Sequence, residues 1–187
     1  NVNLRPEKYL KYLYLPNLFG TDRTKEILHV NPPLVPERIE PEVSRIFVYD
    51  YNADLIEEKQ LTSVSESFSY KGNKRITWIN IDGLRKVDTE AICSFYNIHP
   101  LIEEDILSIG QRPKMDEVDG VMYCLLNMLY YNNQKKIVEI EQISLVLGTD
   151  FVISFQEDAS RDVFDPLRNK LKMARSQIRQ RSADYLL

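Results

Sequence analysis

Three consecutive apolar segments, separated only by short polar turns, most constrain how this chain of 187 residues can fold. Asp119-Gly120, just before the first segment, is a strong signal for a two-residue hairpin turn. Polar residues 132–135 and 148–150 separate the later segments, and connections this short make neighbouring strands antiparallel. We therefore expect an antiparallel sheet whose strands cover residues 121–131, 137–147 and 151–156.

Other parts of the chain add strands and helices to this sheet. β-Branched and aromatic residues predict strands at 46–49 and 75–81. Helices are expected at 61–69, from a cap at Asp88 or Thr89, from Pro100 to about Ser108, and from Asp165 onward. The expected fold class is α/β (α+β), with a mixed parallel and antiparallel sheet between layers of helices.

The composition restricts the class of protein. Lys and Arg number 24 against 28 Asp and Glu, so the net charge is −4. Nucleic acid is not an expected partner, because a general nucleic-acid binder needs a basic surface. The longest apolar run is about six residues, whereas a membrane-spanning helix needs about 20, so no part of this chain is expected to cross a bilayer. GxSxG, GxxxxGK[ST] and GxGxxG are absent, so an enzyme is not expected.

The N-terminal part differs from the rest, because six of the nine prolines lie within the first 41 residues. Proline fixes φ and removes a backbone donor, so residues 1–44 are predicted to form an irregular arm that packs on the domain or on a neighbour. Residues 45–187 are predicted to form the domain that holds the sheet.

Few side chains in this sequence are typical of a reactive site. Cys93 and Cys124 form no CxxC pair and have no His at metal-ligand spacing, so we interpret them as buried reduced thiols. His29 lies in the proline-rich arm, and His99 precedes Pro100, where a structural role at a helix start is the simplest interpretation. Trp78 is expected in the core.

The most suggestive cluster of side chains is Glu103-Glu104-Asp105, early in the helix that Pro100 opens. Acidic residues there complement the helix dipole and can simply face solvent. The alternative is half of a Mg²⁺ site, because Mg²⁺ keeps most of its waters and takes one or two carboxylates. Adjacent residues point about 100° apart on a helix, so Glu104 and Asp105 would need opposing carboxylates from another element.

The last segment of the chain is basic. Residues 161–187 carry a net charge of +4, which leaves −8 on residues 1–160. Apolar residues recur along it at helical spacing, so one long amphipathic helix is expected, ending at Leu187 as a truncated helix without a stop signal. Its basic face can be solvated, dock onto an acidic neighbour or approach anionic headgroups, and the charge asymmetry also favours self-association.

Seven short motifs occur in order within residues 45–187. They are WINIDG (78–83), IHPLIEEDIL (98–107), QRPK (111–114), EQISLVLG (141–148), FQE (155–157), DVFDPLR (162–168) and RSADYLL (181–187). Together they make this chain resemble the N-terminal cytoplasmic domain of the CorA family of magnesium and cobalt transporters. Residues 1–44 lie outside the resemblance.

The resemblance implies an α/β/α funnel domain that is followed, in the family, by long helices and two transmembrane helices. It implies a homopentameric channel in the inner (plasma) membrane, with this domain in the cytoplasm. The family's pore signature, Gly-Met-Asn, is absent from this chain. We therefore expect a fragment that holds the sensing part and reaches the membrane through helices beyond Leu187.

The resemblance also implies a role for two carboxylates. In the family, divalent cations bind between the cytoplasmic domains of adjacent subunits and favour the closed pore. The carboxylate pair of the matching motif falls on Glu104 and Asp105, and the opposing carboxylates would lie beyond Leu187. We expect regulatory binding of Mg²⁺, and of Co²⁺ as an alternative ion, in the whole protein, with weak or absent Mg²⁺ binding by this chain alone.

Two other functions are compatible with these motifs. The related zinc transporter family shares the architecture, and transport of Zn²⁺ without Mg²⁺ flux would favour it. A free-standing soluble metal-binding module is the other alternative. It would be favoured by a reading frame that, after Leu187, lacks Gly-Met-Asn and two apolar runs of about 20 residues.

Overall fold

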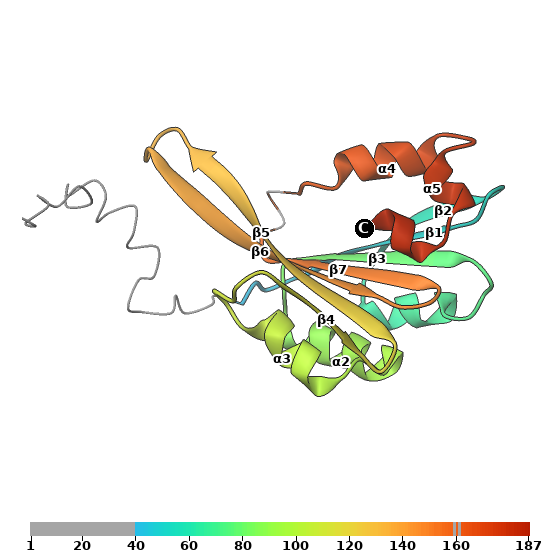
Figure 1. The fold of residues 1–187 in the computed structure, drawn as a ribbon, viewed down its shortest axis with the longest axis horizontal. Helices are drawn as coiled ribbons and strands as arrows, with labels where there is room; N and C mark the ends of the chain where they lie inside the picture. Colours follow the sequence, from blue (N-terminus) through green and yellow to red (C-terminus); the bar gives the residue numbers. More distant parts are fainter. Residues whose placement is uncertain (1–39, 159, 161) are drawn as a thin grey trace, which may run out of the picture. The chain divides into compact units, whose positions relative to one another are not determined.

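The computed structural model describes residues 40–158, 160 and 162–187. His29 and most of the arm predicted at 1–44 lie outside the described residues, so the domain boundary at residue 45 stays a prediction. The described part forms one seven-stranded sheet in the order β2-β1-β3-β7-β6-β5-β4 (Figure 1). The strands are β1 (Arg45–Tyr51), β2 (Ile56–Leu61), β3 (Ile76–Asp82), β4 (Lys114–Val118), β5 (Val121–Asn132), β6 (Ile137–Leu147) and β7 (Phe151–Gln156).

The sheet is mixed, as expected. Its neighbouring strands are antiparallel except β3 and β7, which run parallel with Trp78 opposite Val152. This single parallel pair joins two antiparallel groups, β2-β1-β3 and β7-β6-β5-β4. The hairpin predicted at Asp119-Gly120 is confirmed, since both residues have positive φ and link β4 to β5.

Helices cover both faces of the sheet, so the predicted α/β/α layers are confirmed (Figure 1). The 3₁₀ helix η3 and helices α2 and α3 lie on one face, and α4, α5 and the 3₁₀ helix η4 lie on the other. The bounds of these elements are η3 (Val64–Tyr70), α2 (Lys86–Tyr96), α3 (Pro100–Leu107), α4 (Asp165–Lys172), α5 (Gln177–Gln180) and η4 (Ala183–Leu186).

Each face of the sheet has its own apolar cluster, because side chains alternate along a strand. Along β3, Ile79 joins the cluster on the α2 side, whereas Trp78 joins the cluster on the α4 side. Both are buried, which confirms Trp78 as a core residue. Leu171 of α4 closes the second cluster over Trp78.

The helix predicted at 61–69 is wrong in type and in its first residues. Residues 56–61 form the edge strand β2 instead, and a 3₁₀ helix follows at Val64–Tyr70. The cap predicted at Asp88 or Thr89 is also wrong, because α2 begins at Lys86. The Lys86 backbone N–H donates to the Glu40 carboxylate at 2.5 Å, so a residue far away in the sequence caps this helix.

The single long helix predicted at the end of the chain is wrong as well. Helix α4 ends at Lys172, and Arg175 takes a left-handed conformation with φ of 68°. Two short elements, α5 and η4, follow. The bends keep Leu171, Ile178 and Ala183 in one apolar cluster against the curved sheet, which one straight helix would not do.

Candidate metal site on helix α3

Helix α3 begins where the sequence predicts. His99 occupies the N-cap position and its Nδ1 accepts a hydrogen bond from the Leu101 N–H at 3.2 Å, while Pro100 fills the first helical position. The structural role expected of His99 is therefore confirmed. Ile102 and Ile106 bury one side of the helix in the core, so the acidic residues between them face outward or sideways.

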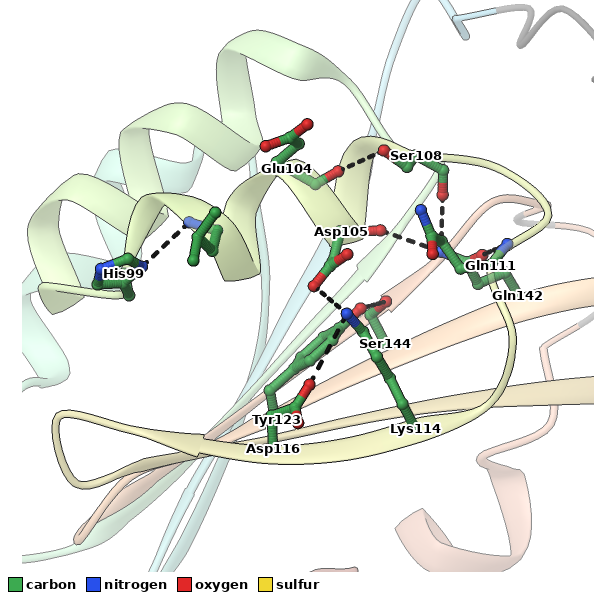
Figure 2. Close-up of polar contacts among 11 residues, drawn as sticks. His99, Glu104, Asp105, Ser108, Gln111, Lys114, Asp116, Tyr123, Gln142 and Ser144 are labelled. Atoms are coloured by element: carbon green, nitrogen blue, oxygen red, sulfur yellow. Dashed lines mark hydrogen bonds and ion pairs between the residues drawn. The ribbon is translucent and has the colours of Figure 1, made fainter.

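The end of α3 is fixed to the sheet by Gln142, a buried residue of β6. Its amide Nε2 donates to the carbonyl oxygens of Ser108 at 2.9 Å and of Asp105 at 3.3 Å (Figure 2). Its Oε1 accepts from the Gln111 N–H at 3.3 Å. These hydrogen bonds hold the helix, and the carboxylates that it carries, at a defined place over the sheet.

Glu104 and Asp105 point in different directions, as their adjacency in a helix requires (Figure 2). The Glu104 side chain is exposed, and the Glu104 backbone carbonyl accepts from the Ser108 hydroxyl at 2.8 Å and from the Ser108 N–H at 2.9 Å. The Asp105 side chain is directed toward strand β4 and is 20% exposed. The structure therefore does not bring the two carboxylates together around one point.

Lys114, the first residue of β4, is the immediate partner of Asp105. Its Nζ lies 2.5 Å from Asp105 Oδ2 and 3.7 Å from Asp116 Oδ2 (Figure 2). The hydrogen bond to Asp105 raises the pKa of Lys114, so the ammonium stays charged. Sequence reasoning missed both Lys114 and Asp116, because the contact joins a helix to a strand across a loop. The QRPK motif was the only signal nearby.

The donor chemistry of this surface fits a hydrated divalent cation shared with a second surface. Carboxylate oxygens are the ligands that Mg²⁺ takes, and it needs only one or two of them. The Lys114 ammonium already lies against the Asp105 and Asp116 carboxylates, so this position attracts positive charge. Among the residues that the structure describes, no group of three or more His, Cys, Asp or Glu is placed to hold a metal ion.

A buried polar chain on the opposite face of the sheet is structural rather than a binding site. Trp78 Nε1 donates to Ser154 Oγ at 2.9 Å, and that hydroxyl donates to Asn80 Oδ1 at 2.7 Å. Asn80 Nδ2 in turn donates to Asp82 Oδ1 at 2.9 Å. Burial raises the pKa of Asp82 to about 6, and the nearby Asp162 carboxylate adds to this rise. This series of hydrogen bonds links strand β3 to strand β7.

The basic residues predicted to form one helical face have separate roles. Arg168 is buried, pairs with Asp162 and Asp165, and lies within 6 Å of three aromatic rings, including that of Trp78. Lys172 pairs with Glu58 of β2 at 2.8 Å. These two cations hold α4 on the sheet, so they are not part of a free basic face.

Both cysteines are free thiols, as expected. Cys93 is buried, but Cys124 is only partly buried, so the expectation of burial holds for Cys93 alone. In the described part of the chain, every helix is too short or too polar to span a membrane.

Comparisons with known proteins identify the family that this chain resembles. The model of the family described as "CorA-like Mg2+ transporter protein" matches residues 73–187. The cobalt/magnesium transport protein CorA of Thermotoga maritima is 37% identical over 143 residues, which cover 76% of this chain and 40% of that protein.

Solved structures show a likeness of fold. The full-length CmaX protein superposes with a TM-score of 0.55 at 13% identity, covering 78% of this chain and 45% of that one. The soluble domain of CorA from Methanocaldococcus jannaschii gives a TM-score of 0.46 at 11% identity, covering 68% and 48%. This chain thus spans less than half the length of each of these proteins. Because the family model matches more than half of its residues, the chain belongs to the CorA-like Mg²⁺ transporter family.

Proposed function

We propose that this chain is the cytoplasmic regulatory region of a membrane transporter for Mg²⁺ and Co²⁺. In this proposal the whole protein is a homopentamer in the inner (plasma) membrane, and Mg²⁺ held at Glu104 and Asp105 between adjacent subunits favours the closed pore. Family membership supports the transporter class, and 37% identity to a cobalt/magnesium transport protein supports the ions.

The observation that carries the regulatory site is the placement of the two carboxylates on α3. Gln142 fixes the helix, Glu104 projects into solvent, and Asp105 already holds a cationic group, the ammonium of Lys114. The two side chains point apart, so each can face a different part of a neighbouring subunit. This arrangement supports half of an intersubunit site rather than a complete site within one chain.

The acidic surface of α3 then acts as a switch. Without a cation, Glu104 and Asp105 repel an acidic surface of the neighbouring subunit, which loosens the closed assembly. A bound Mg²⁺ supplies the positive charge that removes this repulsion. Each site stabilises the closed state by RT ln(1 + [Mg²⁺]/Kd). The contributions of several weak sites in one ring add, and together they shift the equilibrium toward the closed state.

A charge-removal experiment on the whole protein tests this function. Glu104→Ala combined with Asp105→Ala is expected to abolish the protection that Mg²⁺ gives against limited proteolysis. Asp54→Ala combined with Glu90→Ala is the matched control, because it removes two exposed carboxylates elsewhere on the domain. Unchanged protection in the Glu104/Asp105 variant would refute the regulatory site.

A further inference from the structure

Lys114 is the one basic side chain of the described residues that contacts a carboxylate of the proposed regulatory pair. From this contact we propose that the Lys114 ammonium competes with the regulatory cation: it holds Asp105 when Mg²⁺ is scarce and moves to Asp116 when Mg²⁺ takes Asp105. The inference rests on the proposed function and adds a residue that sets the Mg²⁺ concentration at which the site fills.

The geometry sets two cations in competition for one carboxylate. Lys114 Nζ lies 2.5 Å from Asp105 Oδ2, the shorter of its two carboxylate contacts (Figure 2). Direct coordination of Mg²⁺ requires an oxygen at about 2.1 Å, and a cation that close would repel an ammonium group on the same atom. Mg²⁺ is therefore expected to bind Asp105 more tightly once the Lys114 ammonium has withdrawn.

Asp116 gives the displaced ammonium a second partner. Its Oδ2 lies 3.7 Å from Lys114 Nζ, and Lys114 and Asp116 lie on the same strand, β4, two residues apart. Residues at this spacing project on the same face of a strand. The flexible four-carbon stem of lysine lets the ammonium pivot between two carboxylates without a backbone change. Exchange consequently leaves no charge unpaired.

The exposure of the pair keeps this competition mild. The Lys114 and Asp105 side chains are 35% and 20% exposed, so water screens their attraction. Ion pairs at such positions are weak. Lys114 is thus expected to shift the apparent Mg²⁺ affinity by a few fold, enough to tune a sensor and not enough to block it.

The test is a titration of the whole protein with MgCl₂, in which the apparent Kd is the Mg²⁺ concentration that gives half-maximal protection against limited proteolysis. Lys114→Gln is expected to lower the apparent Kd for Mg²⁺ by about fivefold, because it removes the competing charge. Lys114→Arg keeps a cation and is expected not to tighten binding. Asp116→Asn removes the alternative partner and is expected to raise the Kd by about twofold. Lys172→Gln removes an ion-paired lysine on the other face and serves as the control.

A half-protecting Mg²⁺ concentration in Lys114→Gln equal to that of the parent protein would overturn the proposal. Weaker binding in Lys114→Gln would overturn it as well, because Lys114 would then support Asp105 rather than compete for it. A variant that fails to fold would not bind Mg²⁺ more tightly, so tighter binding by Lys114→Gln cannot result from a loss of folding. Lys114→Arg keeps the positive charge and so tests whether the charge is responsible. Lost Mg²⁺ protection in the Glu104/Asp105 variant, together with an unchanged half-protecting Mg²⁺ concentration in Lys114→Gln, would support the regulatory site and refute only the role of Lys114.

Discussion

The ionised carboxylate of Asp82 is expected to lower the free energy of unfolding of this chain. Its side chain is buried at the end of β3, accepts a hydrogen bond from Asn80 at 2.9 Å, and has Arg45, Asp162 and Arg168 as its charged neighbours. Burial and Asp162 together raise its pKa from 3.8 to about 6. Each tenfold change in proton affinity corresponds to about 1.4 kcal/mol. Keeping Asp82 ionised in the folded chain at pH 7.5 therefore costs about 3 kcal/mol.

Asp82→Asn should remove this cost, because the amide has the same size and keeps an oxygen that can accept from Asn80. A carboxyl whose pKa is raised by folding stabilises the folded state below its unfolded pKa, and that stability is lost as pH rises through the folded pKa. The variant is therefore expected to be more stable than the parent chain by about 3 kcal/mol above pH 6. The difference should fall to about half near pH 5 and vanish below pH 3.8.

Urea denaturation of both chains between pH 4 and 8 measures this difference directly. Asp54→Asn is the control, since Asp54 is exposed and its replacement should leave the two chains equal at every pH. A variant at Asp82 that is less stable at pH 7.5, or that differs from the parent by the same amount at all pH values, would refute the reasoning from burial.

Three other substitutions test the packing described above. Gly148→Ala would place a Cβ 2.2 Å from the Phe151 ring, so it should lower the free energy of unfolding by about 2 kcal/mol. Arg168→Ala leaves its carboxylate partners unpaired and removes packing from three rings, and about 3 kcal/mol should be lost in the same urea assay. Gln142→Ala releases the end of α3, and amide hydrogen exchange in that helix should accelerate roughly fivefold.

The central fold could be predicted because its signals are local. The turn at Asp119-Gly120, the N-cap at His99 and the alternating strands around them each depend on a few neighbouring residues. The edge strand β2 could not be predicted, because its sequence, IEEKQL, is mostly polar and exposed and lacks the pattern of a buried strand. It forms because β1 offers a free edge with which it pairs.

Other errors arose where distant residues decide the local structure. The start of α2 depends on Glu40, and the breaks after α4 depend on the shape of the sheet that Leu171 and Ile178 cover. No window of sequence contains these contacts. The periodicity along the last segment correctly indicated an apolar stripe, but it could not show that the stripe follows a bent path.

The candidate site, like the fold, was predictable only where the signal lies in neighbouring residues. Helical geometry alone indicated that Glu104 and Asp105 diverge, and the structure agrees (Figure 2). The contact of Asp105 with Lys114 was not predictable, because the eight residues between them include a helix end and a loop whose path only the folded chain defines. Electrostatic partners across such loops carry no periodic signal.

The parallel pairing of β3 with β7 has a consequence for the order of folding. Among the other strand pairs, the longest connection runs from β1 to β3 through β2 and η3. The β3–β7 pair instead connects Ile76–Asp82 with Phe151–Gln156 across helices α2 and α3 and three further strands. Contacts between such distant segments require the entropy of a long loop to be lost first, and they form slowly. During synthesis, β1, β2 and β3 can pair early, but the centre of the sheet stays open until Gln156 has left the ribosome. The apolar sides of β3 then remain the surface most exposed to wrong partners.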